Sequence, residues 1–281
     1  MELFIIIGFL IVAGVCTATF VLTKKVVLKD YYSANESLKN ELAQKTEELD
    51  RILNKQSKFW SVVTHELKNV FYSFYNSIDL LNTEYENLDE EERKTLIQNI
   101  SNSYNYTLSM INDLMEWSKV NRQLREPNPE TFNLRVLINE LILNLQDSFA
   151  NKDLILSSNI ERDIPVFADR LMIGFIVKNL LSNARKFSNK NDSVTIYTKN
   201  RENFIELYVE DKGIGIPKEN FDKLFNLDEI FSTIGTEREK GTGLGLLICK
   251  DFIELNGGSI NVESEHGKGT LVTVTIPQGK V

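Results

Sequence analysis

The chain has 281 residues, of which 42% are hydrophobic and 26% are charged, so it has the length and composition for two or three small globular domains. Its formal net charge of −8 argues against nucleic acid as the main partner. The two cysteines, Cys16 and Cys249, match no metal-site spacing and indicate unpaired thiols in a reducing compartment.

An apolar run without charged residues occupies residues 3–22, directly before Lys24 and Lys25. Twenty helical residues extend about 30 Å, enough to cross a bilayer, and basic residues mark the cytoplasmic side of a span. No basic segment precedes the run, unlike in a cleaved signal peptide. We therefore predict a single-pass anchor at residues 1–23 in the bacterial inner (cytoplasmic) membrane. With only Met1 and Glu2 before it, we expect almost nothing to project outside.

Residues 30–124 are predicted to form two long helices. The first carries an apolar stripe with coiled-coil steps, made of Leu38, Leu42, Leu49, Ile52, Phe59, Val63, Leu67, Val70, Phe74, Ile78 and Leu81. After a polar turn, Asp89 and Glu92 form a capping-box pattern that begins the second helix. Its apolar face is predicted at Leu96, Ile100, Tyr104, Ile111 and Leu114. A hairpin with one stripe per helix buries little by itself, so we expect a homodimer with a four-helix bundle.

His65 lies on the first of these helices, two residues from both Val63 and Leu67. This spacing places it opposite the stripe, where an imidazole is exposed and can accept a phosphoryl group. Glu66 is adjacent, and a carboxylate near an imidazole can fix its tautomer and raise its basicity. Asn69 lies four residues on and shares the helix face of His65.

Two prolines, Pro127 and Pro129, interrupt the helical pattern and mark a linker. Beyond them, helices and strands alternate. Helices are predicted at 133–151, 169–187 and 244–255, with Asp169 as a cap of the second. Strands are predicted at 154–160, 194–199, 205–210, 259–264 and 270–276. Helices on one face of a mixed sheet form a two-layer α/β sandwich.

Three motifs in this region together specify a nucleotide pocket. The first has Asn179, Asn183 and Lys186 on one helix, where an amide oxygen can bind a hard cation. In the second, Asp211 precedes Gly213 and Gly215, which let the backbone pass close to a flat base. The third contains Gly241, Gly243 and Gly245 and opens a helix, whose N-terminus favours phosphate. It is not a Walker loop, because no Gly-Lys-Ser/Thr follows the glycines.

In this order, the three motifs resemble the N, G1 and G2 boxes of sensor histidine kinases of two-component systems, whose ATP-binding domain is of the GHKL type. The segment Ser61–Phe71 resembles the phosphoacceptor box of the same family, and Phe221–Phe225 resembles its F box. Asn226–Lys240 is then a polar lid over the nucleotide. Val70 departs from the pattern, because the family usually has proline there.

The resemblance implies a role for each matching residue. His65 is the phosphoacceptor, activated by Glu66, and Asn69 positions water for dephosphorylation of the partner. In the pocket, Asn183 binds Mg²⁺, with Asn179 one turn before it, and Lys186 contacts phosphate. Asp211 accepts a hydrogen bond from the adenine amine, the six glycines form the pocket, and Thr270 lies near the adenine.

We therefore expect a membrane-anchored sensor histidine kinase that autophosphorylates with ATP and Mg²⁺. Its phosphoryl group passes to an aspartate on the receiver domain of a separate response regulator, which it also dephosphorylates. The expected parts are an anchor (1–23), a coiled-coil linker helix (24–56), a dimerisation and phosphotransfer domain (57–125) and an ATP-binding domain (131–278). Two alternatives stay open: an ATP-gated machine of the topoisomerase or chaperone kind, and a non-catalytic scaffold.

Overall fold

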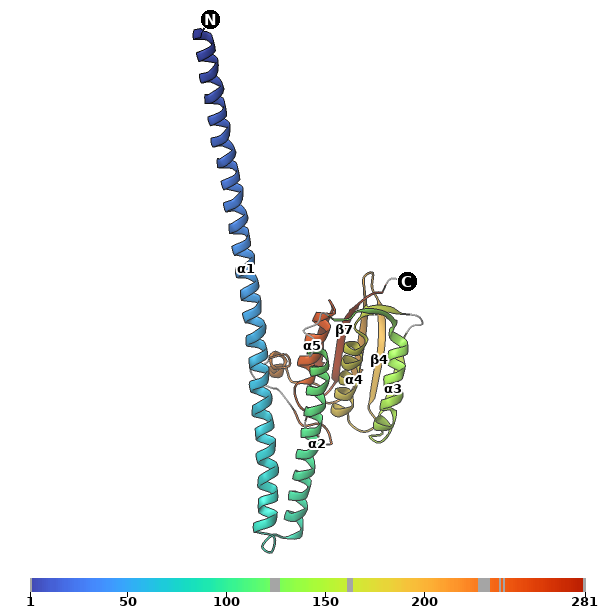
Figure 1. Ribbon diagram of the computed structural model, residues 1–281. Coiled ribbons are helices and arrows are strands. Elements are labelled where there is room, and N and C mark those ends of the chain that lie inside the picture. Colours follow the sequence, from blue (N-terminus) through green and yellow to red (C-terminus); the bar gives the residue numbers. More distant parts are fainter. Residues whose placement is uncertain are drawn as a thin grey trace. The chain divides into compact units, whose positions relative to one another are not determined.

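The computed structural model describes residues 2–121, 127–160, 164–226, 233–237, 239 and 241–279. The chain divides into two compact units, residues 1–60 and 61–281, and each is described by itself. The first helix, α1, covers Glu2–Thr83 and belongs to both (Figure 1).

In the first unit, α1 exposes the side chains of Leu38, Leu42, Leu49 and Ile52. These residues form the predicted coiled-coil stripe, and within the described part of this unit the chain folds nothing over them. The stripe is therefore available to another helix, as the coiled-coil expectation requires.

The predicted assignment to the inner membrane is wrong, and the predicted anchor at residues 1–23 is not confirmed. In the part of the chain that the structure describes, no helix has both the length and the apolar character to cross a membrane. A crossing helix needs about 20 predominantly apolar residues.

The second unit begins with a helical hairpin, formed by the end of α1 and by α2 (Glu90–Asn121). The predicted capping box is confirmed. The Glu92 amide donates to Asp89 Oδ1 at 2.7 Å, and the Asp89 amide donates to Glu92 Oε2 at 2.9 Å. A cap of this kind stabilises a helix by about 1 kcal/mol, and it fixes where α2 starts.

The packing face of the hairpin differs from the prediction on α2. On α1, Val63 and Val70 are buried as expected. On α2, Tyr104 and Ile111 are exposed, whereas Tyr106, Met110 and Trp117 are buried. The predicted face is therefore correct only in part, because Leu96, Ile100 and Leu114 are half-buried while the most buried side chains of α2 are others.

The C-terminal domain is a sheet covered by helices. The remaining elements are β1 (Glu130–Asn133), α3 (Leu134–Ala150), β2 (Ile155–Asn159), β3 (Pro165–Ala168), α4 (Arg170–Phe187), β4 (Ser193–Asn200), β5 (Phe204–Asp211), the 3₁₀ helix η1 (Lys218–Lys223), α5 (Gly245–Leu255), β6 (Ser259–Glu265) and β7 (Gly269–Pro277). The main sheet has the order β2-β4-β5-β7-β6, in which only β2 and β4 are parallel. Figure 1 shows α3, α4 and α5 side by side over this sheet. The predicted two-layer sandwich with a mixed sheet is confirmed.

The helix α4 is the centre of the core. Its buried side chains include Ile173, Ile176, Leu180 and Leu181. Asp169 caps the helix, because its Oδ1 accepts hydrogen bonds from the amides of Leu171 and Met172, as the sequence predicted. A fully buried face gives α4 a fixed position on the sheet, and its opposite edge carries the residues of the candidate site.

A second, two-stranded sheet was not predicted. It pairs β1 with β3 in antiparallel register, with Phe132 opposite Val166. Both strands have only four residues, too short for alternation of apolar and polar residues to be recognised in sequence.

Candidate functional site

A cavity of about 740 Å³ lies at the edge of α4, within the unit 61–281. Its lining includes most of the residues that the sequence predicted for a nucleotide site, namely Asn179, Asn183, Lys186, Asp211, Gly215, Gly241, Gly243, Gly245 and Thr270. Helix α2 also contributes to the lining, and there Asp113 accepts a hydrogen bond from Thr242 Oγ1 at 2.7 Å. The fold thus brings three motifs that are distant in sequence to one cavity of a size suited to a nucleotide.

Asp211 occupies the last position of β5, where the sheet register sets its neighbours. It pairs with Val194 of β4 and with Thr270 of β7, so it ends a central strand. Its side chain is only 7% exposed, and Oδ1 accepts hydrogen bonds from the Gly213 amide at 3.0 Å and the Thr270 amide at 3.2 Å. Burial raises the pKa of Asp211 to about 6, although the two amide hydrogen bonds oppose this rise.

The turn after β5 requires glycine at two positions. Gly215 has a φ of +66°, and a Cβ atom there would lie 2.1 Å from the Glu265 carbonyl oxygen. Gly213 is not among the lining residues, and a Cβ atom there would lie 2.2 Å from the Phe187 carbonyl oxygen. Gly213 therefore brings the turn against the end of α4, whereas Gly215 borders the cavity itself.

The two asparagines of α4 lie one turn apart and contact each other. Asn183 Nδ2 donates to Asn179 Oδ1 at 3.2 Å. The start of α5 approaches the same pair, because a Cβ atom on Gly245 would lie 2.4 Å from Asn179 Nδ2. The absence of a side chain at Gly245 thus allows the glycine-rich loop to close on Asn179.

The cavity can accept a magnesium ion that is bound mainly by phosphate oxygens. Mg²⁺ is usually held by one or two protein oxygens together with substrate phosphates and waters. The amide oxygen of Asn183, which lines the cavity, has the chemistry of such a ligand. Among the described residues, no group of three or more His, Cys, Asp or Glu side chains is placed to hold a metal. These residues fit a cation that arrives with its nucleotide.

Lys186 borders the cavity and is held there by a main-chain group. Its Nζ donates to the Thr233 carbonyl at 2.8 Å and lies 4.5 Å from the centre of the Phe187 ring. The ammonium group thus already has a position at the cavity. Two other cations of the predicted lid, Arg238 and Lys240, lie outside the described residues.

His65 and its two predicted partners lie together on α1, away from the cavity lining. The His65 side chain is 71% exposed, as the spacing predicted. Its Nδ1 lies 3.2 Å from Asn69 Nδ2 and 3.8 Å from Glu66 Oε1. The other oxygen of Glu66 accepts a hydrogen bond from the Tyr106 hydroxyl at 3.2 Å. An exposed imidazole with a held carboxylate at one nitrogen has the chemistry of a nucleophile and its orienting partner.

Sequence reasoning missed several residues at this site. His266, in the turn between β6 and β7, borders the cavity but is in none of the three pocket motifs. Tyr106 and Lys152 also belong to no recognised motif, and each contacts a residue far away in sequence: Glu66 for Tyr106, and Glu239 of the predicted lid for Lys152. No local sequence pattern signals such contacts.

Residues 168–280 match the family described as histidine kinase-, DNA gyrase B- and HSP90-like ATPase. These residues form an ATPase domain of that family. The match covers Asp169, the three pocket motifs and the last two strands of the sheet. It explains why the cavity of the ATPase domain has the motifs of an ATP site.

Curated relatives extend the similarity beyond the ATPase domain. The chain is 32% identical to the sensor histidine kinase RcsC of Escherichia coli K12 over 249 residues, covering 86% of this chain and 25% of the relative. It is 30% identical to the adaptive-response sensory kinase SasA of Prochlorococcus marinus over 238 residues, covering 84% and 61%. The chain thus spans about a quarter of RcsC and about three fifths of SasA. The resemblance to sensor histidine kinases is confirmed.

Solved structures share the fold. Histidine kinase ThkA, in a crystal structure with the response regulator protein TrrA, aligns with a TM-score of 0.60 at 24% identity, covering 77% of this chain and 60% of that chain. Histidine kinase AdeS of Acinetobacter baumannii aligns with a TM-score of 0.55 at 21% identity, covering 77% and 98%.

Proposed function

We propose that this chain is an ATP-dependent protein-histidine kinase of a two-component system, with His65 as its phosphoacceptor. One observation carries the proposal. The same chain holds an ATPase-family cavity with all three pocket motifs and an exposed histidine whose Nδ1 faces a supported carboxylate. An ATP-gated machine or a scaffold would leave this second arrangement without a role.

In the ATPase domain, Asp211 selects the base. Its carboxylate is already oriented by two amides and can accept a hydrogen bond from the 6-amino group of adenine, in whose place guanine has a carbonyl that cannot donate. Asn183 supplies an oxygen for Mg²⁺, Asn179 supports Asn183, and Lys186 contacts phosphate. Mg²⁺, when bound, offsets the charge of the phosphates. The loop of Gly241, Gly243 and Gly245 lets the phosphates reach the start of α5.

At the acceptor, Nε2 of His65 is the nucleophile. We propose that Nδ1 carries the ring proton and directs it toward Glu66, whose Oε1 lies 3.8 Å away in this structure, so that the lone pair is on Nε2. That lone pair forms the bond to the γ-phosphorus while the bond to the bridging oxygen breaks, and ADP leaves. Glu66 stabilises the positive charge that develops on the ring, and Tyr106 keeps the Glu66 carboxylate in place.

The phosphoryl group then passes to an aspartate of a response-regulator receiver domain on a separate chain. The crystal structure of ThkA with TrrA supports this class of partner. We propose that the same surface also dephosphorylates the regulator, with Asn69 positioning the attacking water. Asn69 suits this role because its amide lies at 3.2 Å from His65 Nδ1, next to the atoms that the regulator must approach.

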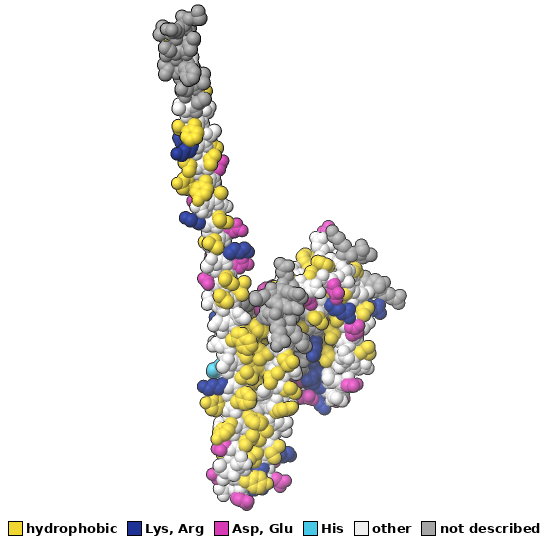
Figure 2. Space-filling view, in the orientation of Figure 1, with side chains coloured by type: hydrophobic (Ala, Val, Ile, Leu, Met, Phe, Trp, Pro, Cys, Tyr) yellow, Lys and Arg dark blue, Asp and Glu magenta, His cyan; other side chains and the backbone are white. Residues whose placement is uncertain are grey.

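The hairpin also has the surface of a dimerisation domain. Large hydrophobic side chains stay exposed on it, among them Phe71, Tyr75, Ile97, Leu108 and Met115, and Figure 2 shows such side chains gathered along the hairpin. A second copy of the hairpin would bury them in a four-helix bundle. We accordingly assign residues 57–125 to dimerisation and phosphotransfer and 131–278 to ATP binding.

Incubation with γ-³²P-labelled ATP tests the proposal. We expect label that is stable in alkali and labile in acid, as phosphohistidine is. Release of free phosphate without protein label would indicate an ATPase, and neither product would indicate a scaffold. His65→Gln should abolish the label while binding a fluorescent ATP analogue like the wild type. Label retained on His65→Gln would show that His65 is not the acceptor.

A further inference from the structure

Lys152 is a buried lysine outside every recognised motif of this chain. It follows α3, and its side chain is 1% exposed. A lysine is almost never buried this fully unless its charge is paired. Its contacts therefore show what the charge does in the domain.

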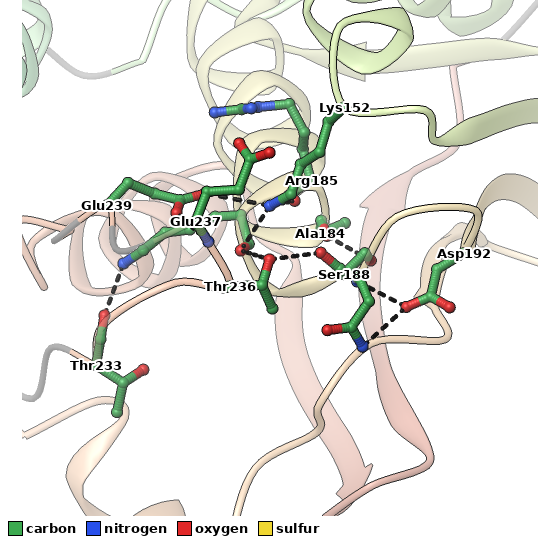
Figure 3. A network of polar contacts seen from close by, with 11 residues as sticks. Lys152, Ala184, Arg185, Ser188, Asp192, Thr233, Thr236, Glu237 and Glu239 are labelled. Atoms are coloured by element: carbon green, nitrogen blue, oxygen red, sulfur yellow. Dashed lines mark hydrogen bonds and ion pairs between the residues drawn. The ribbon is translucent and has the colours of Figure 1, made fainter.

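Two of its partners are main-chain carbonyls at the end of α4. Lys152 Nζ donates to the Arg185 carbonyl at 2.9 Å and to the Lys186 carbonyl at 3.2 Å (Figure 3). The carbonyl end of a helix is negative, so a cation stabilises it. These contacts alone would make Lys152 a helix cap.

The third partner of Lys152 is Glu239, which lines the nucleotide cavity. Lys152 Nζ lies 3.2 Å from Glu239 Oε1, and Figure 3 shows the two side chains pointing toward each other. Glu239 is one of the cavity-lining residues, as is Glu237, whereas Lys152 is not. The other carboxylate oxygen, Glu239 Oε2, accepts from the Glu237 amide at 2.9 Å. Both oxygens of Glu239 are thus engaged.

The segment that carries Glu239 is attached to the same end of α4. The Thr236 amide donates to the Lys186 carbonyl at 3.1 Å, and Thr236 Oγ1 donates to the Ser188 carbonyl at 2.7 Å. Lys186 Nζ in turn donates to the Thr233 carbonyl. These contacts hold the described residues 233–237 against the end of α4 that carries Lys186, the lysine that we assign to phosphate.

A free carboxylate at this position would repel a nucleotide. A triphosphate carries several negative charges, and like charges at short range in a partly buried site destabilise binding. Glu239 is 28% exposed and lines the cavity, so solvent screens it only in part. Lys152 approaches it from the protein interior and offsets its charge.

We propose that Lys152 is a positioning residue for the nucleotide: it holds and neutralises Glu239 so that the cavity accepts anionic phosphates. This inference rests on the proposed ATP site and adds a function to a residue that contacts no nucleotide. It makes a prediction that a helix cap does not make. Loss of the Lys152 charge should weaken phosphate-bearing ligands selectively, and removal of the Glu239 charge should restore them.

The test uses the full chain and two ligands, a fluorescent ATP analogue and adenosine as its competitor. Lys152→Gln keeps a donor for the two carbonyls but has no charge. We expect it to raise the Kd of the ATP analogue about fivefold or more, in the range of coupling between contacting groups, and to leave the Kd of adenosine within about twofold. Lys152→Gln/Glu239→Gln should recover most of the lost affinity. Glu239→Gln alone should bind the analogue as tightly as the wild type or more tightly.

Lys190→Met is the matched control, because Lys190 forms an exposed ion pair with Asp153 in the same region. It should change neither affinity. Thermal melts without nucleotide show which variants fold. If Lys152→Gln does not fold, Glu239→Gln still decides, because weaker ATP binding by this variant would mean that the carboxylate helps the nucleotide and would overturn the proposal.

If Lys152→Gln lost as much affinity for adenosine as for the ATP analogue, Lys152 would be a helix cap only. The same conclusion would follow if the double variant bound the ATP analogue no more tightly than Lys152→Gln. Failure of the wild type to bind the analogue at all would instead refute the ATP site itself.

Discussion

Asp211 and Thr270 face each other across β5 and β7, and the Thr270 amide donates to the Asp211 carboxylate at 3.2 Å. The carboxylate is thus oriented by the sheet itself before any ligand arrives. Its burial raises the pKa to about 6, which brings its titration close to neutral pH.

We predict that ATP affinity falls as the pH is lowered through about 6, because protonated Asp211 loses its acceptor charge. Below that pH, the part due to Asp211 should decrease about tenfold per pH unit. Asp211→Asn should bind ATP about tenfold to a hundredfold more weakly, the range for a hydrogen bond to a charged group, and its pH profile should be flatter. Titrations of a fluorescent ATP analogue between pH 5 and pH 8 measure both, and parallel profiles for the two proteins would contradict the assignment.

The raised pKa of Asp211 also leads to a prediction about the stability of the protein without nucleotide. The folded state binds a proton at Asp211 more tightly than the unfolded chain does. This group's contribution to the free energy of unfolding is therefore fully present below pH 4 and is lost as the pH rises through about 6. Asp211→Asn should consequently melt no lower than the wild type at pH 7.5. A clearly lower melting temperature would show that the carboxylate is needed for folding.

Asn183→Ala should remove the magnesium dependence of nucleotide binding. We expect the Kd of the ATP analogue in Mg²⁺ to rise about tenfold, with little difference from wild type in EDTA. Thermal melts exclude a folding defect. An Asn183→Ala protein that still binds more tightly with Mg²⁺ than without would show that another group provides the metal ligand.

Glu66→Gln should slow autophosphorylation about a hundredfold, the lower range for an acid–base group, without changing nucleotide affinity. Tyr106→Phe keeps the carboxylate but removes the hydrogen bond that supports it, so a smaller loss of rate is expected. Single-turnover assays with labelled ATP measure the rates. A Tyr106→Phe protein with the wild-type rate would mean that Glu66 needs no support from α2.

Asn69→Ala should slow dephosphorylation of the regulator about tenfold or more and slow autophosphorylation less than about threefold. The difference arises because Asn69 contacts the acceptor ring but is not the nucleophile. The assay follows decay of a phosphorylated regulator in the presence of ADP, beside autophosphorylation of the same preparation. Decay at the wild-type rate would remove Asn69 from the phosphatase step.

Local signals predicted the secondary structure of the ATPase domain well. Asp169 was recognised as a cap, and α4 begins at Arg170 and ends at Phe187, as expected. The face of α2 was predicted correctly only in part, because Tyr104 and Ile111 look as apolar in the sequence as Tyr106 and Met110 do. Only tertiary packing decides which of them are buried.

The motif residues of the candidate site were predictable for a similar reason. Asparagines and glycines at fixed spacings form a pattern that can be recognised in the sequence, and most of the pocket residues of this kind line one cavity in the structure. Lys152 is part of no recognisable sequence pattern, because a lysine in a polar turn is normally solvated. Its acceptors lie 33, 34 and 87 residues away in sequence, so its role depends on tertiary structure alone.

The hydrogen bond between Tyr106 and Glu66 joins the two helices of the hairpin at the residue next to the acceptor. One carboxylate oxygen faces the imidazole, while the other depends on a hydroxyl from α2. A shift or rotation of one helix against the other would thus change how the Glu66 carboxylate is presented to His65. Because Tyr106 also lines the cavity, this one side chain connects the packing of the hairpin helices, the acceptor and the nucleotide site.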